Sequence, residues 1–309
     1  MDMYQKRKMR QEKKNSSKNN GVEKIQLNWY PGHMAKTKRL IRENLNLVDI
    51  VYEVIDARIP YSSKIKDIDE LIKDKPRLLI MSKYDLCDKI ETDKWIEYYN
   101  NKGYYVITVN LLEKSVSKKI IDKTSEILSK LVLKREEKGI INSKFRALVI
   151  GIPNVGKSTL INLLCSKKKV ETGNKPGVTK NLNWINVNEK LDLLDTPGIL
   201  WPKFDDKVVA YNLASMTAIK ETVIDNIDIS IYILNKLEEL YPEVLLNKYN
   251  IKHVNNEDIC ETLDIIGKRY GCIIFKGEID YDRVCNIIIN DIKNSNIKGI
   301  TFDRISNNN

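Results

Sequence analysis

The residues with the clearest chemical role lie in a glycine-rich turn at residues 151–158. The turn reads GIPNVGKS and fits the pattern G-x-x-x-x-G-K-[ST]. It follows an apolar run at 147–150 and precedes a helical stretch at 158–164, the setting in which such a turn binds phosphate. We expect Lys157 to bridge the β- and γ-phosphates and Ser158 to coordinate Mg²⁺. The phosphate-binding set comprises Asn154, Val155, Gly156, Lys157, Ser158 and Thr159.

Two further segments fit the same phosphate site. Asp195-Thr-Pro-Gly198 follows the apolar run 191–194, 37 residues after Ser158. A carboxylate at the end of such a strand can hold Mg²⁺, commonly through water, and the Gly198 N–H is placed to sense the γ-phosphate. Between them, Lys175-Pro-Gly-Val-Thr179 offers the Thr179 hydroxyl from a flexible segment that can order around Mg²⁺ and the γ-phosphate.

A third segment, Ser82-Lys83-Tyr84-Asp85, can read a base. Asp85 can accept hydrogen bonds from guanine N1 and N2, a donor pattern that adenine lacks, and Lys83 can lie along the ring. The usual form of this motif is Asn-Lys-x-Asp, so Ser82 is a departure that weakens the expected base contact. Asn110, which follows the next strand-like run, is included among the expected nucleotide-binding residues.

The elements that must position these residues alternate between two periodicities. Six short apolar runs read as strands, and amphipathic helical stretches separate most of them, which predicts a mostly parallel, doubly wound α/β sheet. The expected strands are 47–55, 77–81, 104–109, 147–152, 182–187 and 191–194. After about residue 203, apolar residues recur at helical spacing, so we expect a small all-helical domain at 205–309.

Composition and charge limit the class of protein. The 309 residues carry a net charge of +10, with +15 in residues 1–204 and −5 in 205–309. The first 24 residues hold eight basic and three acidic residues and no apolar face, so the arm 1–26 fits a disordered tail or a polyanionic partner such as nucleic acid. No apolar run approaches the length of a membrane span or a secretory signal. Five scattered cysteines indicate a reducing compartment, and we expect a cytoplasmic protein.

The order of the motifs is unusual. In Ras-like GTPases the base-reading motif follows the phosphate loop, whereas here Asp85 precedes Gly151 by 66 residues. The sequence thus resembles circularly permuted GTPases, and more narrowly the ribosome biogenesis GTPase A (YlqF) family. The resemblance covers about residues 27–305. Its matching stretches are Trp29-Tyr-Pro-Gly-His33-Met-Ala-Lys36, Asp56-Ala-Arg-Ile-Pro60, Lys75-Pro-Arg-Leu-Leu79, the turn at 151–159, Pro176-Gly-Val-Thr-Lys180 with Trp184, Asp195-Thr-Pro-Gly-Ile199 and Lys276-Gly-Glu-Ile-Asp-Tyr-Asp-Arg283.

The resemblance implies a fold, an activity and a partner. It implies a circularly permuted Ras-like GTPase domain at 27–204, followed by the helical domain at 205–309, which would contact ribosomal RNA. It also implies binding of GTP, GDP and Mg²⁺, and a GTPase that acts in late assembly of the large ribosomal subunit. The partner would be the precursor of that subunit with its rRNA, and a monomer is favoured. The loop after Ser63 departs from the family pattern, so its contacts stay open.

Hydrolysis needs a group that orients water. Ras-like enzymes use a glutamine after the Asp-x-x-Gly motif, where this chain has Ile199, so we expect slow intrinsic turnover. His33 follows Pro31-Gly32 near an expected helix start, where an imidazole could position or deprotonate water, although the residue context by itself favours a turn or capping histidine. The resemblance implies that the matching histidine acts in hydrolysis. His253, in a polar loop, reads as structural or exposed.

Several alternatives stay open from the sequence. Asn154 occupies the position where some phosphate-loop GTPases hold K⁺, although Pro-Asn also simply favours a turn. A related permuted GTPase of small-subunit or organellar ribosome assembly would carry similar motifs. A nucleotide-gated RNA-binding scaffold with incidental hydrolysis would too. Asp85 argues against a fourth alternative, an ATPase.

Overall fold

The computed structural model describes most of the chain. It describes residues 32–65, 68–72, 75–140, 143–165, 182–198, 206–219 and 224–305, except for the side chains of 32–35. By internal contacts the chain divides into two compact units. The first comprises Met1–Gln26, Phe204–Met216 and Glu221–Ile297, and the second comprises Leu27–Lys203, Thr217–Lys220 and Lys298–Asn309. The second unit holds the sheet, and we call it the nucleotide unit; the first is the helical unit.

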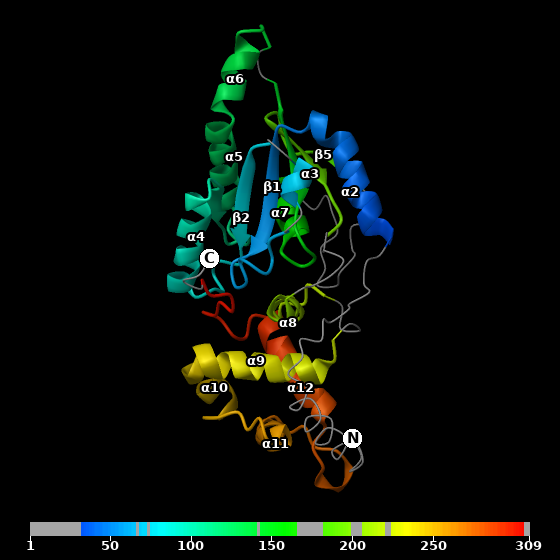
Figure 1. The fold of residues 1–309 in the computed structure, drawn as a ribbon, viewed down its shortest axis with the longest axis vertical. Coiled ribbons are helices and arrows are strands. Elements are labelled where there is room, and N and C mark those ends of the chain that lie inside the picture. The colour runs from blue at the N-terminus through cyan, green and yellow to red at the C-terminus, as the bar shows by residue number, and fades with distance from the viewer. Residues whose placement is uncertain are drawn as a thin grey trace. The chain divides into compact units, whose positions relative to one another are not determined.

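A six-stranded sheet forms the centre of the nucleotide unit (Figure 1). Its spatial order is β3-β2-β1-β4-β6-β5, in which only the β5–β6 pair is antiparallel. The strands are β1 (Ile50–Asp56), β2 (Arg77–Ser82), β3 (Tyr105–Thr108), β4 (Phe145–Ile150), β5 (Asn183–Asn186) and β6 (Leu191–Asp195). This confirms the predicted α/β class with a mostly parallel sheet.

Each predicted strand is present, with ends that match the prediction or differ from it by at most three residues. The first begins at Ile50 rather than at residue 47, because Leu45–Leu47 forms a 3-10 turn that ends the preceding helix. The fourth ends at Ile150, because the chain turns away from the sheet into the glycine-rich loop there. Every residue of β1 is buried, as expected for a central strand covered on both faces.

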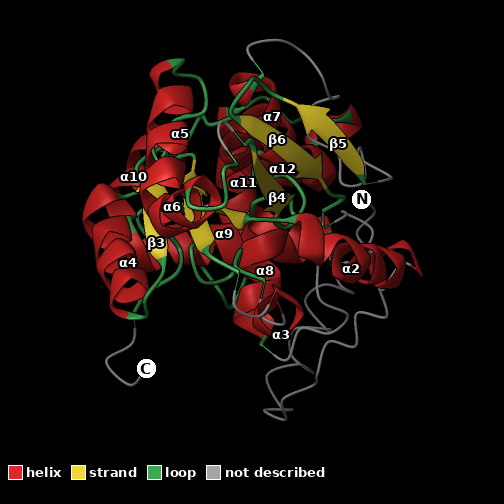
Figure 2. Ribbon diagram, turned by 90° about the horizontal axis from the view of Figure 1, so that it is seen from above, coloured by secondary structure: helices red, strands yellow, loops and turns green. Residues whose placement is uncertain are grey.

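Helices cover both faces of the sheet. Figure 2 shows α5 and α7 on one side of the sheet and α2 and α3 on the other. On one face, Ile55 and Met81 pack against Trp95 and Tyr99 of α4. The helices of this unit are α2 (Gly32–Asn44), α3 (Ile68–Ile72), α4 (Lys89–Asn101), α5 (Ser115–Ile127), α6 (Ser129–Glu136) and α7 (Lys157–Leu164). On the opposite face, Tyr52 bonds through its hydroxyl to Thr124 of α5 at 2.7 Å.

The helical unit is built from amphipathic helices. They are α8 (Lys207–Ser215), α9 (Asn226–Leu240), α10 (Pro242–Tyr249), α11 (Ile259–Arg269) and α12 (Tyr281–Lys293), with a 3-10 turn at Phe275–Gly277. Helix α9 packs against α8, α10 and α12 and buries Ile233, Leu234 and Leu237. Four of the helices begin with an aspartate whose carboxylate accepts a backbone N–H, so part of the negative charge of this region serves as helix caps. Among the described residues, no helix is long and apolar enough to cross a bilayer.

Candidate nucleotide-binding site

The glycine-rich loop joins β4 to α7 as its pattern predicts. Helix α7 begins at Lys157, and Gly156 precedes it with φ 98°, a left-handed conformation that a side chain would strain. A Cβ on Gly156 would also lie 2.8 Å from Cδ1 of Leu111. The loop therefore presents its backbone and the first turn of α7 at the carboxyl edge of the sheet, with Ser158 and Thr159 half-buried on that turn.

Lys157 is buried beneath this loop. Its Nζ donates to the carbonyl oxygens of Gly151 at 3.0 Å and Ile152 at 2.9 Å. Burial lowers the pKa of Lys157 to about 8, and the nearby Asp195 opposes that shift. The ammonium is thus held among acceptors that are weaker than a phosphate, which would make a bound triphosphate its preferred partner.

The aspartate-threonine-proline-glycine segment leaves β6 next to the phosphate loop. Asp195 is almost fully buried at the end of β6, opposite Val149 of β4, and the Thr196 hydroxyl donates to the Val149 carbonyl at 2.7 Å. A Cβ on Gly198 would lie within 3.0 Å of the backbone of Pro153, so only glycine permits this approach of the two loops. The structure brings Asp195 and Gly198 to the phosphate loop.

The oxygen donors here suit Mg²⁺. Ser158 offers a hydroxyl from the first turn of α7, and Asp195 offers a carboxylate from the adjacent strand, which are the hard ligands that this ion binds. Among the described residues, no group of three or more His, Cys, Asp or Glu side chains gathers to hold a metal. Such a sparse donor set fits an ion that takes its other ligands from phosphate and water.

The base-reading segment contacts the phosphate loop directly. Ser82, fully buried at the end of β2, lies with its Oγ 2.6 Å from the Val155 carbonyl and 2.9 Å from the Ile55 carbonyl. A hydroxyl carries one proton, so the shorter contact to Val155 is the better hydrogen bond. Ser82 therefore joins the base-reading segment to the phosphate loop. The sequence motif, in which Ser82 replaces the usual asparagine, does not predict this contact. Asp85, three residues on, is exposed at the same edge.

Lys83 is held by a buried ion cluster. It adopts φ 58°, and its Nζ donates to Asp56 Oδ2 at 2.8 Å. Asp56 also accepts two bonds from the Arg58 guanidinium, at 3.0 and 2.8 Å. Burial would raise the pKa of Asp56, but Arg58 and Lys83 outweigh it and hold the pKa well below its ordinary value. Sequence reasoning noted Asp56 and Arg58 only as matching residues and assigned them no role.

Asn110 bonds within its own turn, whereas Asn154 bonds to a distant segment. Asn110 donates to Glu113 Oε1 at 3.1 Å and accepts the backbone N–H of Leu112 at 3.1 Å. Asn154 adopts φ 62°, and its Nδ2 donates to the Thr217 carbonyl at 2.6 Å. Thr217 has no motif around it, so sequence reasoning could not place it at the phosphate loop.

Some predicted site residues lie outside the described residues. These are Thr179, Ile199 and the arm 1–26. His33 lies in the first turn of α2, near a helix start as expected, but its side chain is not described.

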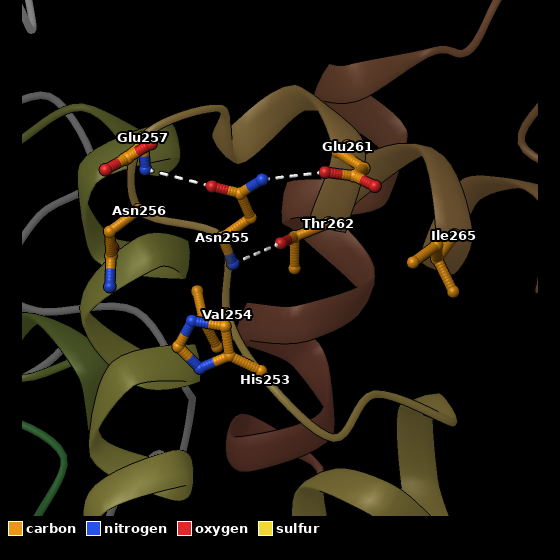
Figure 3. Close-up of a pocket in the computed structure, with 8 residues that line it drawn as sticks. All are labelled: His253, Val254, Asn255, Asn256, Glu257, Glu261, Thr262 and Ile265. Atoms are coloured by element: carbon orange, nitrogen blue, oxygen red, sulfur yellow. Dashed lines mark hydrogen bonds between the residues drawn. The ribbon is translucent and has the colours of Figure 1, made fainter.

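The second histidine belongs to a different surface. His253 is exposed and pairs through Nδ1 with Glu238. Figure 3 shows it lining a pocket of the helical unit with Asn255, whose amide donates to Glu261 Oε2 at 2.7 Å. The same Asn255 accepts the backbone N–H of Glu257 at 3.0 Å, so its polar atoms serve the turn itself.

The geometry defines a phosphate-loop nucleotide-binding domain with permuted connectivity. The base-reading strand β2 and the phosphate strand β4 flank β1, so their carboxyl ends share one edge although β2 comes first in the chain. The direct contact of Ser82 with Val155 joins the two sites. The class is therefore that of circularly permuted phosphate-loop GTPases.

Comparison with known proteins narrows the class to a family. A family model described as "50S ribosome-binding GTPase" matches residues 146–264. The chain is 44% identical over 278 residues to "Ribosome biogenesis GTPase A" of Priestia megaterium, covering 90% of this chain and 96% of that protein. It is 42% identical to the protein of the same name from Bacillus licheniformis, over 90% and 98% of the two chains. The solved structure of GNP-bound YlqF from T. maritima is similar with a TM-score of 0.61 and 25% identity, over 87% of this chain and 98% of that one.

These matches show the family. The chain belongs to the ribosome biogenesis GTPase A family and is a GTPase.

Proposed function

We propose that this GTPase acts as an assembly factor for the large ribosomal subunit, and that GTP hydrolysis gates its binding to and release from the precursor particle. The observation that carries the proposal is the match to relatives named "Ribosome biogenesis GTPase A", and the Ser82–Val155 contact supports it because it joins the segment after β2 to the glycine-rich loop. The family model carries the words "50S ribosome-binding". We propose that this chain also binds the 50S ribosomal subunit.

The roles in nucleotide binding follow from position. Asp85 reads the guanine edge, and Lys83 lies along the ring, with Asn110 closing the next turn. The phosphates lie against the backbone of residues 154–159, where the start of α7 favours negative charge. Ser158, Asp195 and Thr179 would hold Mg²⁺, which would supply positive charge next to the phosphates.

Hydrolysis depends on groups at the phosphate end of the site. Lys157 turns from the loop carbonyls to the β- and γ-phosphates and stabilises the charge that develops there. His33, in the first turn of α2, orients or deprotonates the attacking water, because Ile199 has no atom that can do so. Gly198 senses the γ-phosphate through its N–H. Turnover is accordingly slow until the particle completes the site.

The outer side of α2 supports contact with RNA. Lys36, Arg39 and Arg42 are exposed on this helix, while Thr37 and Ile41 are buried beneath it. These cations follow the basic N-terminal arm in the sequence, and they suit a phosphate backbone. Because α2 carries His33, docking of this surface on ribosomal RNA would set the position of His33. We place the protein in the bacterial cytoplasm as a monomer, with the helical unit adding further RNA contacts.

Turnover with purified ribosomal particles tests the proposal. GTP hydrolysis by wild type and His33→Ala is measured alone, with small subunits and with large-subunit precursor particles. We expect stimulation by large-subunit particles only, and a loss of that stimulation in His33→Ala with GDP affinity unchanged. Stimulation by small subunits would favour the small-subunit alternative. No stimulation by either would favour the RNA-binding scaffold.

A further inference from the structure

We propose that residues 298–305, which we call the strap, position the guanine-reading loop, and that Asp303 is the positioning residue that anchors the strap. This inference rests on the proposed role of Asp85. The strap follows the last helix of the helical unit but belongs to the nucleotide unit. It contacts two loops, the one after β1 at residues 57–65 and the one after β2 at residues 83–88.

The anchor of the strap is a buried carboxylate. Asp303 is 6% exposed and accepts the backbone N–H of Ser62 at 2.7 Å and the Ser62 hydroxyl at 2.6 Å. Ser62 is fully buried in the loop after β1 and lies 241 residues earlier in the chain. Two short bonds to one carboxylate are stronger than bonds between neutral groups, so this pair fixes the end of the strap against the first loop.

The strap backbone holds the second loop. Gly299 N and Ile300 N both donate to the Leu86 carbonyl, at 2.8 and 3.3 Å. The backbone N–H of Asp88 donates to the Thr301 hydroxyl at 3.2 Å. Leu86 directly follows Asp85 in sequence. The strap therefore supplies the partners of the backbone on the carboxyl side of the guanine-reading residue.

The strap also joins the loop that holds Lys83. Phe302 N donates to the Arg58 carbonyl at 2.8 Å. The Arg58 guanidinium clamps Asp56, which in turn accepts the Lys83 ammonium at 2.8 Å. A buried ion cluster of this kind depends on exact geometry, because the attraction must offset the desolvation of each charge. The strap therefore bonds to Arg58, which holds Lys83 through Asp56, and to Leu86, which follows Asp85.

The preference for GDP over IDP distinguishes a positioning role of the strap from a general effect on stability. Asp85 accepts hydrogen bonds from guanine N1 and N2, whereas hypoxanthine lacks the N2 amino group. A loosened loop would lose the contact to N2 that sets GDP apart from IDP, while the phosphates still bind residues 154–159. The ratio of the two affinities therefore reports on the position of Asp85, because a change in the folded fraction scales both affinities alike.

The test measures Kd for GDP and for IDP with the full chain and its Asp303→Ala variant. We expect GDP binding to weaken and the ratio Kd(IDP)/Kd(GDP) to fall by about threefold or more. Asp303→Asn should keep most of the ratio, since its carbonyl can accept from Ser62 N and its amide can donate to the Ser62 hydroxyl. Asp291→Ala is the matched control: Asp291 is a buried aspartate of the helical unit, bonded to Tyr249 at 3.0 Å.

An unchanged ratio in Asp303→Ala, or an equal fall in Asp291→Ala, overturns the inference. If Asp303→Ala does not fold, Ser62→Ala takes its place under the same criteria, because it removes one donor to Asp303 and leaves the carboxylate. A wild-type protein that binds GDP and IDP equally would instead overturn the guanine-reading role of Asp85 and hence the proposed function.

Discussion

Replacing Ser82 by alanine tests whether one hydroxyl couples the base-reading strand to the phosphate loop. The change removes the donor to the Val155 carbonyl at 2.6 Å in a fully buried position. A buried acceptor left without its donor costs about 1–3 kcal/mol. We expect the free energy of unfolding to fall by an amount in that range.

The same loss should weaken nucleotide binding, because Val155 belongs to the loop that binds phosphate. We expect the Kd for GDP to rise about tenfold, which corresponds to ~1.4 kcal/mol. Titration with a fluorescent GDP analogue measures the affinity, and urea unfolding of the nucleotide-free protein measures the stability.

Ser230→Ala provides a matched control for this variant. Ser230 is also fully buried and bonds through its hydroxyl to two carbonyls, Asn226 at 2.7 Å and Cys285 at 3.2 Å, but it lies in the helical unit. It should lower stability similarly and leave GDP affinity unchanged. A Ser82→Ala variant that loses stability but binds GDP as tightly as wild type would contradict the proposed coupling.

Four further predictions concern the phosphate loop and its neighbours. The pKa of Lys157 is about 8 without nucleotide, so the neutral fraction of this side chain grows above pH 8. Because GDP should bind the charged form, we expect it to bind about tenfold more weakly at pH 9 than at pH 7, with proton uptake on binding. Calorimetric titrations that show the same affinity at both pH values would contradict this. Because the unfolded chain keeps this proton up to its higher ordinary pKa, the stability of the nucleotide-free protein should rise with pH between about 8 and 10. Gly198→Ala forces a Cβ against Pro153. We therefore expect GTP turnover to fall more than tenfold while GDP affinity is unchanged, and turnover at the wild-type rate would contradict the close approach of the two loops. If Asn154 holds K⁺, turnover is faster in K⁺ than in Na⁺ and Asn154→Ala abolishes the difference, whereas equal turnover in both salts rejects the role.

The sheet and the motif positions were predictable because they rest on local patterns. Runs of apolar residues set the strands, and the glycine-rich turn between a strand and a helix set the phosphate loop. The permuted order needed one further rule, that the carboxyl ends of parallel strands share an edge wherever they occur in the chain. In the structure β2 and β4 both lie beside β1, so Asp85, which follows β2, and Lys157, which follows β4, lie at the same edge of the sheet.

What the sequence could not indicate are the contacts made across long separations without a motif. Ser62 and Asp303 are common polar residues in unremarkable surroundings, and only the fold pairs them across 241 residues. Thr217 reaches Asn154 from a turn that has no pattern of its own. The sequence predicts a weakened base contact at Ser82, because the motif shows that the usual amide is lost but does not show the Val155 carbonyl that the hydroxyl contacts.

Two segments that flank residues 221–297 in the chain contact the two halves of the expected site. Thr217 accepts a hydrogen bond from Asn154 of the glycine-rich loop, and the strap donates to the loop after β2 through Gly299 and Ile300. Both segments belong to the nucleotide unit, although residues 221–297 between them belong to the helical unit. Contacts of this kind join residues that are far apart in the chain, so they follow from the fold and not from any local pattern.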